Sequence, residues 1–110
     1  AEAVYRRRTF AYDARYTAGM TTYHTPARLG PEYSARLAEV AIGAHRVLGL
    51  RDVSRTDAIV TPDGEVFFLE VNVSPGLTET SMLPMSVAAV DRTVGDVYAA
   101  LIETAIARNR

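Results

Sequence analysis

Two oxygen-bearing side chains interrupt a stretch that otherwise has the composition of a buried strand. Residues 67–73 are Phe-Phe-Leu-Glu-Val-Asn-Val, and Glu70 and Asn72 occupy alternate positions, which share one face of a strand. Arg55 and Asp57 are spaced in the same way in the preceding stretch. Two carboxylates and an amide form a hard-oxygen set, which suits Mg²⁺ completed by water and phosphate oxygens. An arginine beside such a set would neutralise charge on a transferring phosphoryl group.

Whether these four side chains meet depends on how the two strands pair. We expect strands over about 53–60 and 65–73, joined by a hairpin turn at 61–64 (Thr-Pro-Asp-Gly). An even loop of four residues places position 57 opposite 68 and position 55 opposite 70, with all four polar side chains on one face. An odd loop without a bulge would separate them. The alternative interpretation of this pattern is a cross-strand ion pair between Arg55 and Glu70 on a solvated face.

The remaining elements follow from local patterns. A helix is predicted from about Pro31 to Gly49, because its apolar residues recur with helical spacing and its ends carry proline and glycine. Helical spacing returns weakly at 85–90 and strongly over 94–105, with Thr93 as the cap. Residues 9–31 predict a long surface loop, and residues 1–4 carry no start signal for a helix or strand. The predicted class is α+β, an antiparallel hairpin with helices packed on one face.

Composition narrows the classes of protein further. The chain has 110 residues, enough for a single domain with a modest core. Its 12 basic and 13 acidic residues nearly cancel, which gives no indication of a nucleic-acid or membrane partner. The absence of cysteine favours a reducing, cytoplasmic location, and no apolar run approaches the roughly 18 residues of a membrane span. The first residue is alanine, which suggests a piece of a longer polypeptide.

Three segments resemble the C-terminal signature of D-alanine–D-alanine ligases, which are ATP-grasp enzymes of peptidoglycan synthesis. These segments are Arg55-Thr56-Asp57, residues 69–78 (Leu-Glu-Val-Asn-Val-Ser-Pro-Gly-Leu-Thr) and residues 80–84 (Thr-Ser-Met-Leu-Pro). The resemblance extends from about Phe10 to the end. It implies a C-terminal ATP-grasp subdomain with a long substrate-side loop. On this view residues 1–110 are a single domain, and the N-terminal substrate domain and the central nucleotide-clasp subdomain are missing.

The resemblance also implies a role for each polar residue of the hairpin and the following loop. In such ligases ATP phosphorylates the first D-alanine, and the amine of the second attacks the acyl phosphate. Asp57, Glu70 and Asn72 would hold two Mg²⁺ ions, with Mn²⁺ as an alternative, and Glu70 would bridge them. Arg55 would stabilise the transferred phosphoryl group and the oxyanion. Two residues of the loop complete the expected set, since the Gly76 amide would also bind the oxyanion and Ser81 would bind the carboxylate of the second D-alanine.

A motif in the long loop resembles the family's Tyr-Glu-Ala-Lys-Tyr, and here it is Tyr-Asp-Ala-Arg-Tyr at 12–16. The resemblance places Arg15 near the γ-phosphate of ATP and Tyr16 toward the substrate amine. Arginine keeps the charge of lysine but changes its geometry. Two alternatives therefore stay open: a related ATP-grasp carboxylate–amine ligase with another amino acid, and a non-catalytic module that retains the fold. The expected partners are ATP, D-alanine and the missing domains, with a homodimer left open, and we expect the chain alone to be inactive.

Overall fold

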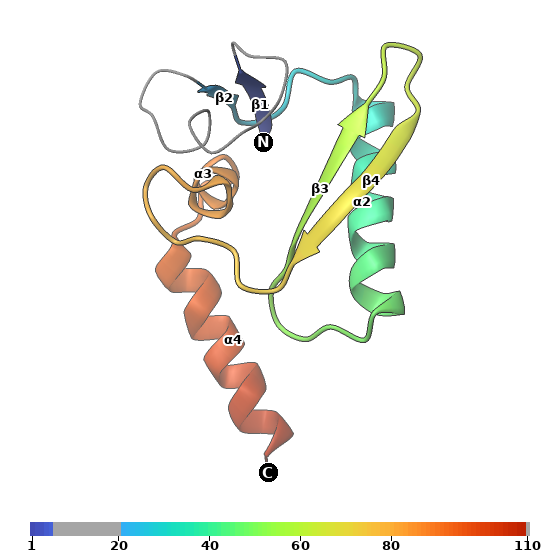
Figure 1. Ribbon diagram of the computed structural model, residues 1–110. Coiled ribbons are helices and arrows are strands. Elements are labelled where there is room, and N and C mark those ends of the chain that lie inside the picture. Colours follow the sequence, from blue (N-terminus) through green and yellow to red (C-terminus); the bar gives the residue numbers. More distant parts are fainter. Residues whose placement is uncertain (6–20, 110) are drawn as a thin grey trace.

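The structure, a computed structural model, describes residues 1–5 and 21–109 (Figure 1). Two antiparallel sheets of two strands each and three helices make up this part of the chain, which confirms the predicted α+β class. The predicted long loop lies largely outside the described residues. In chain order the elements are β1 (Glu2–Tyr5), β2 (Thr21–His24), α2 (Pro31–Val47), β3 (Arg55–Val60), β4 (Val66–Asn72), α3 (Met82–Ala88) and α4 (Val94–Arg108).

The first sheet was not predicted. β1 pairs with β2, Glu2 opposite His24 and Ala3 opposite Tyr23, although residues 1–4 carry no strand signal and 21–24 were assigned to a loop. Arg28, which follows β2, holds the end of β1 through three hydrogen bonds. Its backbone N and its Nε donate to Glu2 Oε2 at 3.0 and 3.1 Å, and its Nη2 donates to Oε1 at 2.8 Å. These contacts join residues far apart in sequence, which local propensity does not reveal.

Helix α2 begins and ends where its sequence predicts. Pro31 occupies the first helical position, where its missing N–H costs nothing, and Glu32 lies in the first turn. At the other end Gly49 has a φ of 63°, a left-handed conformation that favours glycine. Gly49 N donates to Arg46 O and Leu50 N donates to His45 O, the hydrogen bonds of a Schellman motif.

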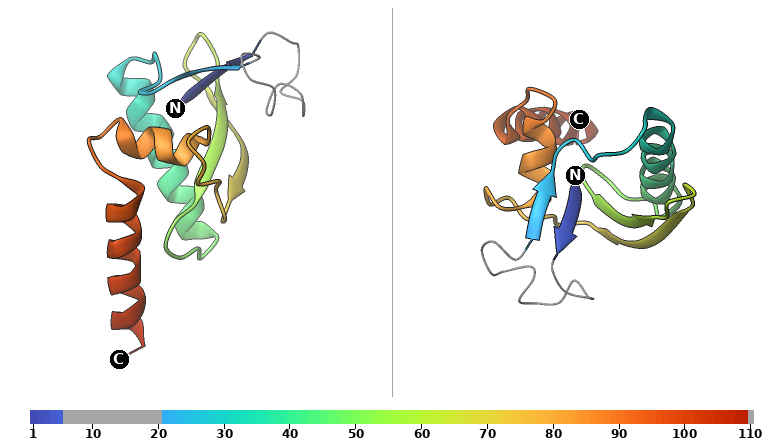
Figure 2. Two further views of the ribbon diagram at one scale, coloured as in Figure 1. Left: turned by 90° about the vertical axis from the view of Figure 1, so that its left-hand side faces the viewer. Right: turned by 90° about the horizontal axis from the view of Figure 1, so that it is seen from above.

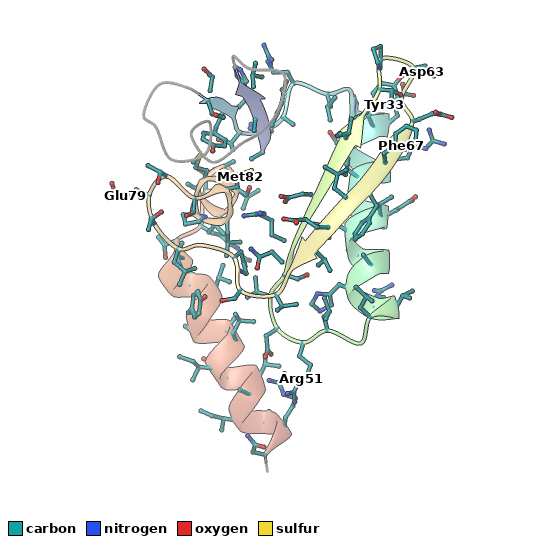
Figure 3. The ribbon with its side chains drawn as sticks, viewed as in Figure 1. Tyr33, Arg51, Asp63, Phe67, Glu79 and Met82 are labelled. Carbon is teal, nitrogen blue, oxygen red and sulfur yellow. The ribbon has the colours of Figure 1, made fainter. Side chains whose placement is uncertain are left out.

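The β3–β4 hairpin closes with a longer turn than expected. Val60 pairs with Val66, so five residues form the loop instead of the four that were predicted. Gly64 has a φ of 86°, and a Cβ at this position would collide with the ring of Tyr33. Figure 3 shows Tyr33 beneath the turn that carries Asp63. Arg36 Nη1 also donates to Gly64 O at 3.2 Å, so the first turns of α2 fix the turn of the hairpin.

Only one helix covers the hairpin. Helix α2 contacts both β3 and β4, whereas α3 and α4 contact each other and lie to the side of the hairpin (Figure 2). The prediction that helices pack together on one face is therefore correct for α2 alone. Among the described residues Val87, at 8% exposure, is the single buried side chain of the hydrophobic core and none is fully buried, so the expected modest core is not formed by this part of the chain. Phe67, Phe68 and Leu69 of β4 are about half exposed.

The C-terminal helices have clear start signals. Thr93 caps α4 as predicted, because its hydroxyl accepts from Asp96 N at 3.1 Å while Asp96 Oδ2 accepts from Thr93 N at 3.0 Å. Helix α3 begins earlier than its weak spacing indicated, with Pro84 in its first turn. In the part of the chain that the structure describes, no helix has the length and apolar character to cross a membrane.

Candidate functional site

A β-bulge determines which side chains of the hairpin meet. From Val60–Val66 to Ala58–Phe68 the ladder is regular, and its continuation would place Asp57 opposite Leu69. The register shifts between Asp57 and Ala58, so that Leu69 is the extra residue of β4 and Asp57 lies opposite Glu70. The odd number of loop residues and the extra residue of the bulge thus compensate for each other. Because Asp57 and Glu70 are directly opposed, their side chains lie on the same face of the hairpin.

The predicted partners were wrong, but the predicted shared face is present. Arg55 lies opposite Asn72, not Glu70, and Asp57 lies opposite Glu70, not Phe68. This polar face is turned away from α2. Ser54 and Thr56, which alternate with Arg55 and Asp57, line a groove together with residues of α2, so the intervening side chains project to the opposite side.

Arg55 joins the two carboxylates. Its Nε donates to Asp57 Oδ1 at 2.7 Å and its Nη2 donates to Oδ2 at 2.9 Å, a bidentate pair. The same Nη2 lies 3.9 Å from Glu70 Oε1. The Arg55 and Asp57 side chains are only 22% and 20% exposed, whereas Glu70 is 56% exposed. The bond to Asp57, followed by the charges of Asp57 and Glu70, raises the pKa of Arg55, so the guanidinium is a permanent cation here.

Tyr23 is a neighbour of this face that sequence reasoning missed. It belongs to β2, in the other sheet, and the charge of its ionised form is the last of the causes that raise the pKa of Arg55. The relevant signal was present in the sequence, because residues 21–24 are Thr-Thr-Tyr-His, and β-branched and aromatic residues favour strands.

Asn72 directs the chain out of β4. Its Oδ1 accepts a hydrogen bond from Ser74 N at 2.9 Å, an Asx turn that leads into Ser74-Pro75-Gly76. Pro75 is buried, which fixes this exit. The amide oxygen retains a second lone pair for another ligand.

The loop after β4 brings Gly76 and Ser81 together. A Cβ on Gly76 would lie 2.6 Å from Ser81 Oγ and 3.3 Å from Ser81 Cβ, so the serine hydroxyl occupies the space that a side chain would need. Ser81 Oγ also lies 2.8 Å from Thr78 Oγ1. In Figure 3 this segment, with Glu79 at its outer bend and Met82 at the start of α3, runs between the end of the hairpin and α3. The other two predicted site residues, Arg15 and Tyr16, lie outside the described residues.

The donor set of the hairpin fits a hard cation with few protein ligands. Within the described ranges, no three residues drawn from histidine, cysteine, aspartate and glutamate form a cluster that could hold a metal ion. Asp57 and Glu70, which form a cross-strand pair, and the amide oxygen of Asn72 are the ligands that Mg²⁺ prefers when water and phosphate supply the rest.

A groove of about 350 Å³ opens on the other side of the hairpin and is separate from the polar face. His45, Ser54 and Thr56 are among its lining residues, and His45 Nδ1 lies 2.8 Å from Ser54 Oγ. The Thr56 hydroxyl is buried there and has no hydrogen-bond partner among the residues that the structure describes. None of the predicted site residues that the structure describes lines this groove.

The described residues form an α+β fold in which an arginine, two carboxylates and an amide share a hairpin face, and this face leads into a loop that bears glycine and hydroxyl groups. The family model described as "D-ala D-ala ligase C-terminus" matches residues 1–107, and the chain belongs to this family. The resemblance stated from the sequence is confirmed.

Curated relatives agree with this assignment. A D-alanine–D-alanine ligase of Oleidesulfovibrio alaskensis is 45% identical over 98 residues, which cover 89% of this chain and 32% of the relative. The ligase of an Anaeromyxobacter species is 47% identical over 81 residues, which cover 74% of this chain and 26% of that relative. The ligase of Agrobacterium fabrum is 38% identical over 100 residues, which cover 87% of this chain and 32% of that relative. The chain thus spans about a third of the length of these relatives.

Proposed function

We propose that this chain forms the Mg²⁺-, ATP-phosphate- and D-alanine-binding portion of a D-alanine–D-alanine ligase. The observation that carries the proposal is the gathering of Arg55, Asp57 and Glu70 on one hairpin face, achieved by a bulge that compensates for an odd turn. An ion pair that only stabilised a solvated face would need neither the bulge nor the adjoining glycine- and serine-bearing loop.

Asp57, Glu70 and Asn72 are the proposed ligands of two Mg²⁺ ions, with Glu70 shared between them. When bound, the ions neutralise and align the phosphates of ATP. Arg55 is anchored on Asp57 and reaches toward Glu70, so its guanidinium can exchange a carboxylate oxygen for a phosphoryl oxygen. Arginine suits this exchange because its planar fork presents several donors at once.

The loop after β4 is the proposed substrate side. The N–H of Gly76 is assigned to the oxyanion that forms when the second D-alanine attacks the acyl phosphate of the first. The Ser81 hydroxyl, which lies against Gly76, is assigned to the carboxylate of that second D-alanine. Arg15 and Tyr16 are proposed to act at the γ-phosphate and the substrate amine.

We further propose that residues 1–110 act as one unit with the remaining part of a longer enzyme, which supplies the rest of the nucleotide clasp and the first substrate site. Exposed apolar side chains such as Phe67 and Leu69 support this, because burying them against another part of the polypeptide would stabilise the hairpin. The location proposed for the whole enzyme is the cytoplasm, and a homodimer remains compatible with the fold.

The test is D-alanine-dependent phosphate release from ATP by the full-length protein, with the dipeptide identified by mass spectrometry. We expect D-alanyl-D-alanine from the full-length enzyme and no phosphate release from the 110-residue chain alone, because catalysis of this type is mostly positioning. A dipeptide that contains another amino acid in the second position would show that the acceptor is not D-alanine. The absence of any ligation by the folded full-length protein would contradict the proposal.

A further inference from the structure

We propose that Thr78 is a positioning residue that orients the Ser81 hydroxyl for an incoming carboxylate, with Thr80 supporting Thr78. This inference rests on the proposed function and concerns the acceptor side of the same site. Neither threonine belongs to the residues assigned above.

Thr78 is bound to Ser81 through both its backbone and its side chain. Ser81 N donates to Thr78 O at 2.8 Å, and the two hydroxyl oxygens lie 2.8 Å apart. Thr80 Oγ1 lies 3.3 Å from Thr78 Oγ1. The contact between the hydroxyls favours one staggered χ1 rotamer of Ser81, and the backbone hydrogen bond keeps the two residues at the spacing that this contact needs.

The Ser81 hydroxyl is not used by the helix that it precedes. Ser81 is the N-cap residue of α3, yet its side chain makes no capping hydrogen bond. A capping serine normally accepts from the N–H of the second or third helical residue, and here the third is Pro84, which has no N–H. The hydroxyl is instead directed to Thr78 and to the space beside Gly76.

The stoichiometry of donors fixes the direction of the hydrogen bonds once a carboxylate binds. A hydroxyl has one proton to donate and two lone pairs that accept, whereas a carboxylate only accepts. Ser81 must therefore donate to the carboxylate and accept from Thr78, which in turn can accept from Thr80. In this chain of hydroxyls each donor polarises the next, so Thr78 both orients and strengthens the Ser81 donor.

Gly76 completes the arrangement by providing space. Its backbone is not in the left-handed region, since the positive-φ glycines among the described residues are Gly49 and Gly64. The requirement for glycine comes from Ser81 Oγ, which would lie 2.6 Å from a Cβ at position 76. The Gly76 backbone and the Ser81 hydroxyl can therefore act on neighbouring groups of the tetrahedral intermediate, the oxyanion from the first D-alanine and the carboxylate of the second.

The test compares Thr78→Val, Thr78→Ser and Thr80→Val in the full-length enzyme, with Thr104→Val on α4 as the matched control. The rate is measured as the D-alanine concentration is varied, and one Michaelis constant is fitted for each of the two D-alanine sites. The constant for the second D-alanine, which acts as the acceptor, is called the acceptor constant. We expect Thr78→Val to raise the acceptor constant about threefold to tenfold, the effect of one lost neutral hydrogen bond, with kcat and the constant for ATP nearly unchanged. Thr78→Ser should restore the parent value, Thr80→Val should have a smaller effect, and Thr104→Val none.

A double-mutant cycle separates this role from a merely structural one. If Thr78 acts through Ser81, Thr78→Val should have no further effect on the acceptor constant in a Ser81→Ala background. An unchanged acceptor constant in Thr78→Val, or an equal loss with and without Ser81, would overturn the inference. A parent enzyme that does not ligate D-alanine at all would instead overturn the proposed function.

Discussion

Two neighbouring regions hold their polar groups in place by different physical means. On the β3–β4 hairpin, Arg55, Asp57 and Glu70 come from two strands, meet through the strand register and are held by charge. In the loop at 76–81, Gly76 and Ser81 come from one short segment and are held by neutral hydrogen bonds and steric fit. Removing a charge should therefore damage the first region, and changing a shape should damage the second.

The largest effect is expected from removing the cation of the hairpin. Arg55→Met in the full-length enzyme should lower kcat by about 10²–10³, the usual cost of one preorganised electrostatic group. Because Asp57 would lose its partner, added Mg²⁺ should raise the thermal midpoint of the variant more than that of the parent. Arg36→Met, which removes an arginine that contacts only the turn in the described structure, is the control for the loss of a long cationic side chain. An equal response of both variants would contradict the electrostatic role of Arg55 on the hairpin face.

A smaller effect, confined to the loop, is expected from Gly76→Ala. The new Cβ would displace the Ser81 hydroxyl, so the Michaelis constant for the acceptor D-alanine should rise about tenfold, the loss of one well-placed hydrogen bond to a charged group. The response of the thermal midpoint to Mg²⁺ should stay as in the parent. A changed response to Mg²⁺ with an unchanged acceptor constant would reverse the assignment of the two regions.

Two further glycines test the framework beneath the hairpin. Gly64→Ala should lower the free energy of unfolding by about 2 kcal/mol, because φ is 86° there and Tyr33 occupies the space of a Cβ. Gly43→Ala is the matched control in the middle of α2, where nothing lies within 4 Å of a new Cβ. It should raise the stability by about 0.5–1 kcal/mol, the gain in helix propensity. Urea unfolding of both variants measures the difference, and a stabilising Gly64→Ala would contradict the contact with Tyr33.

The smallest effect concerns the stability of the fold at low pH, and it involves neither the hairpin face nor the loop at 76–81. Arg28 lowers the pKa of Glu2 from 4.5 to about 2, chiefly through the side-chain hydrogen bond. Because the folded-state pKa is the lower one, the pair contributes stability above pH 4.5, and this contribution is lost as the pH falls toward 2. An NMR titration of the Glu2 carboxyl measures the pKa, and Arg28→Ala should return it toward 4.5. A Glu2 pKa that is unchanged in this variant would show that the pair does not form.

The sequence predicted those features that depend on neighbours in the chain. Pro31, Gly49 and Thr93 mark helix ends by local chemistry, and all three do so in the structure. The pairing of β1 with β2 and the bulge at Leu69 depend on contacts between distant segments, for which a single sequence carries little signal. The sequence predicted that the polar hairpin residues share one face, but it did so from a turn of four residues. They share that face because the turn has five residues and the bulge at Leu69 compensates for the odd number.

The loop at 76–81 shows the same limit in another form. Ser81 and Gly76 were selected by family resemblance, and the close approach that explains the glycine is visible only in three dimensions. Thr78 and Thr80 both lie in segments that resemble the family, but nothing in the sequence distinguished one from the other. The hydrogen bonds to Ser81 make that distinction.

The proposed role of Glu70 is decided by kcat of the full-length Glu70→Gln enzyme, determined on the same sample as its thermal midpoint. Glutamine preserves the size of the side chain, and Glu70 is 56% exposed and 3.9 Å from Arg55, so the stability should change by no more than about 1 kcal/mol. Turnover should fall by at least about 10²–10³, because the charge of a shared cation ligand is lost. Turnover within about threefold of the parent, accompanied by a small loss of stability, would mean that Glu70 serves only as an ion-pair partner and would contradict the proposed site.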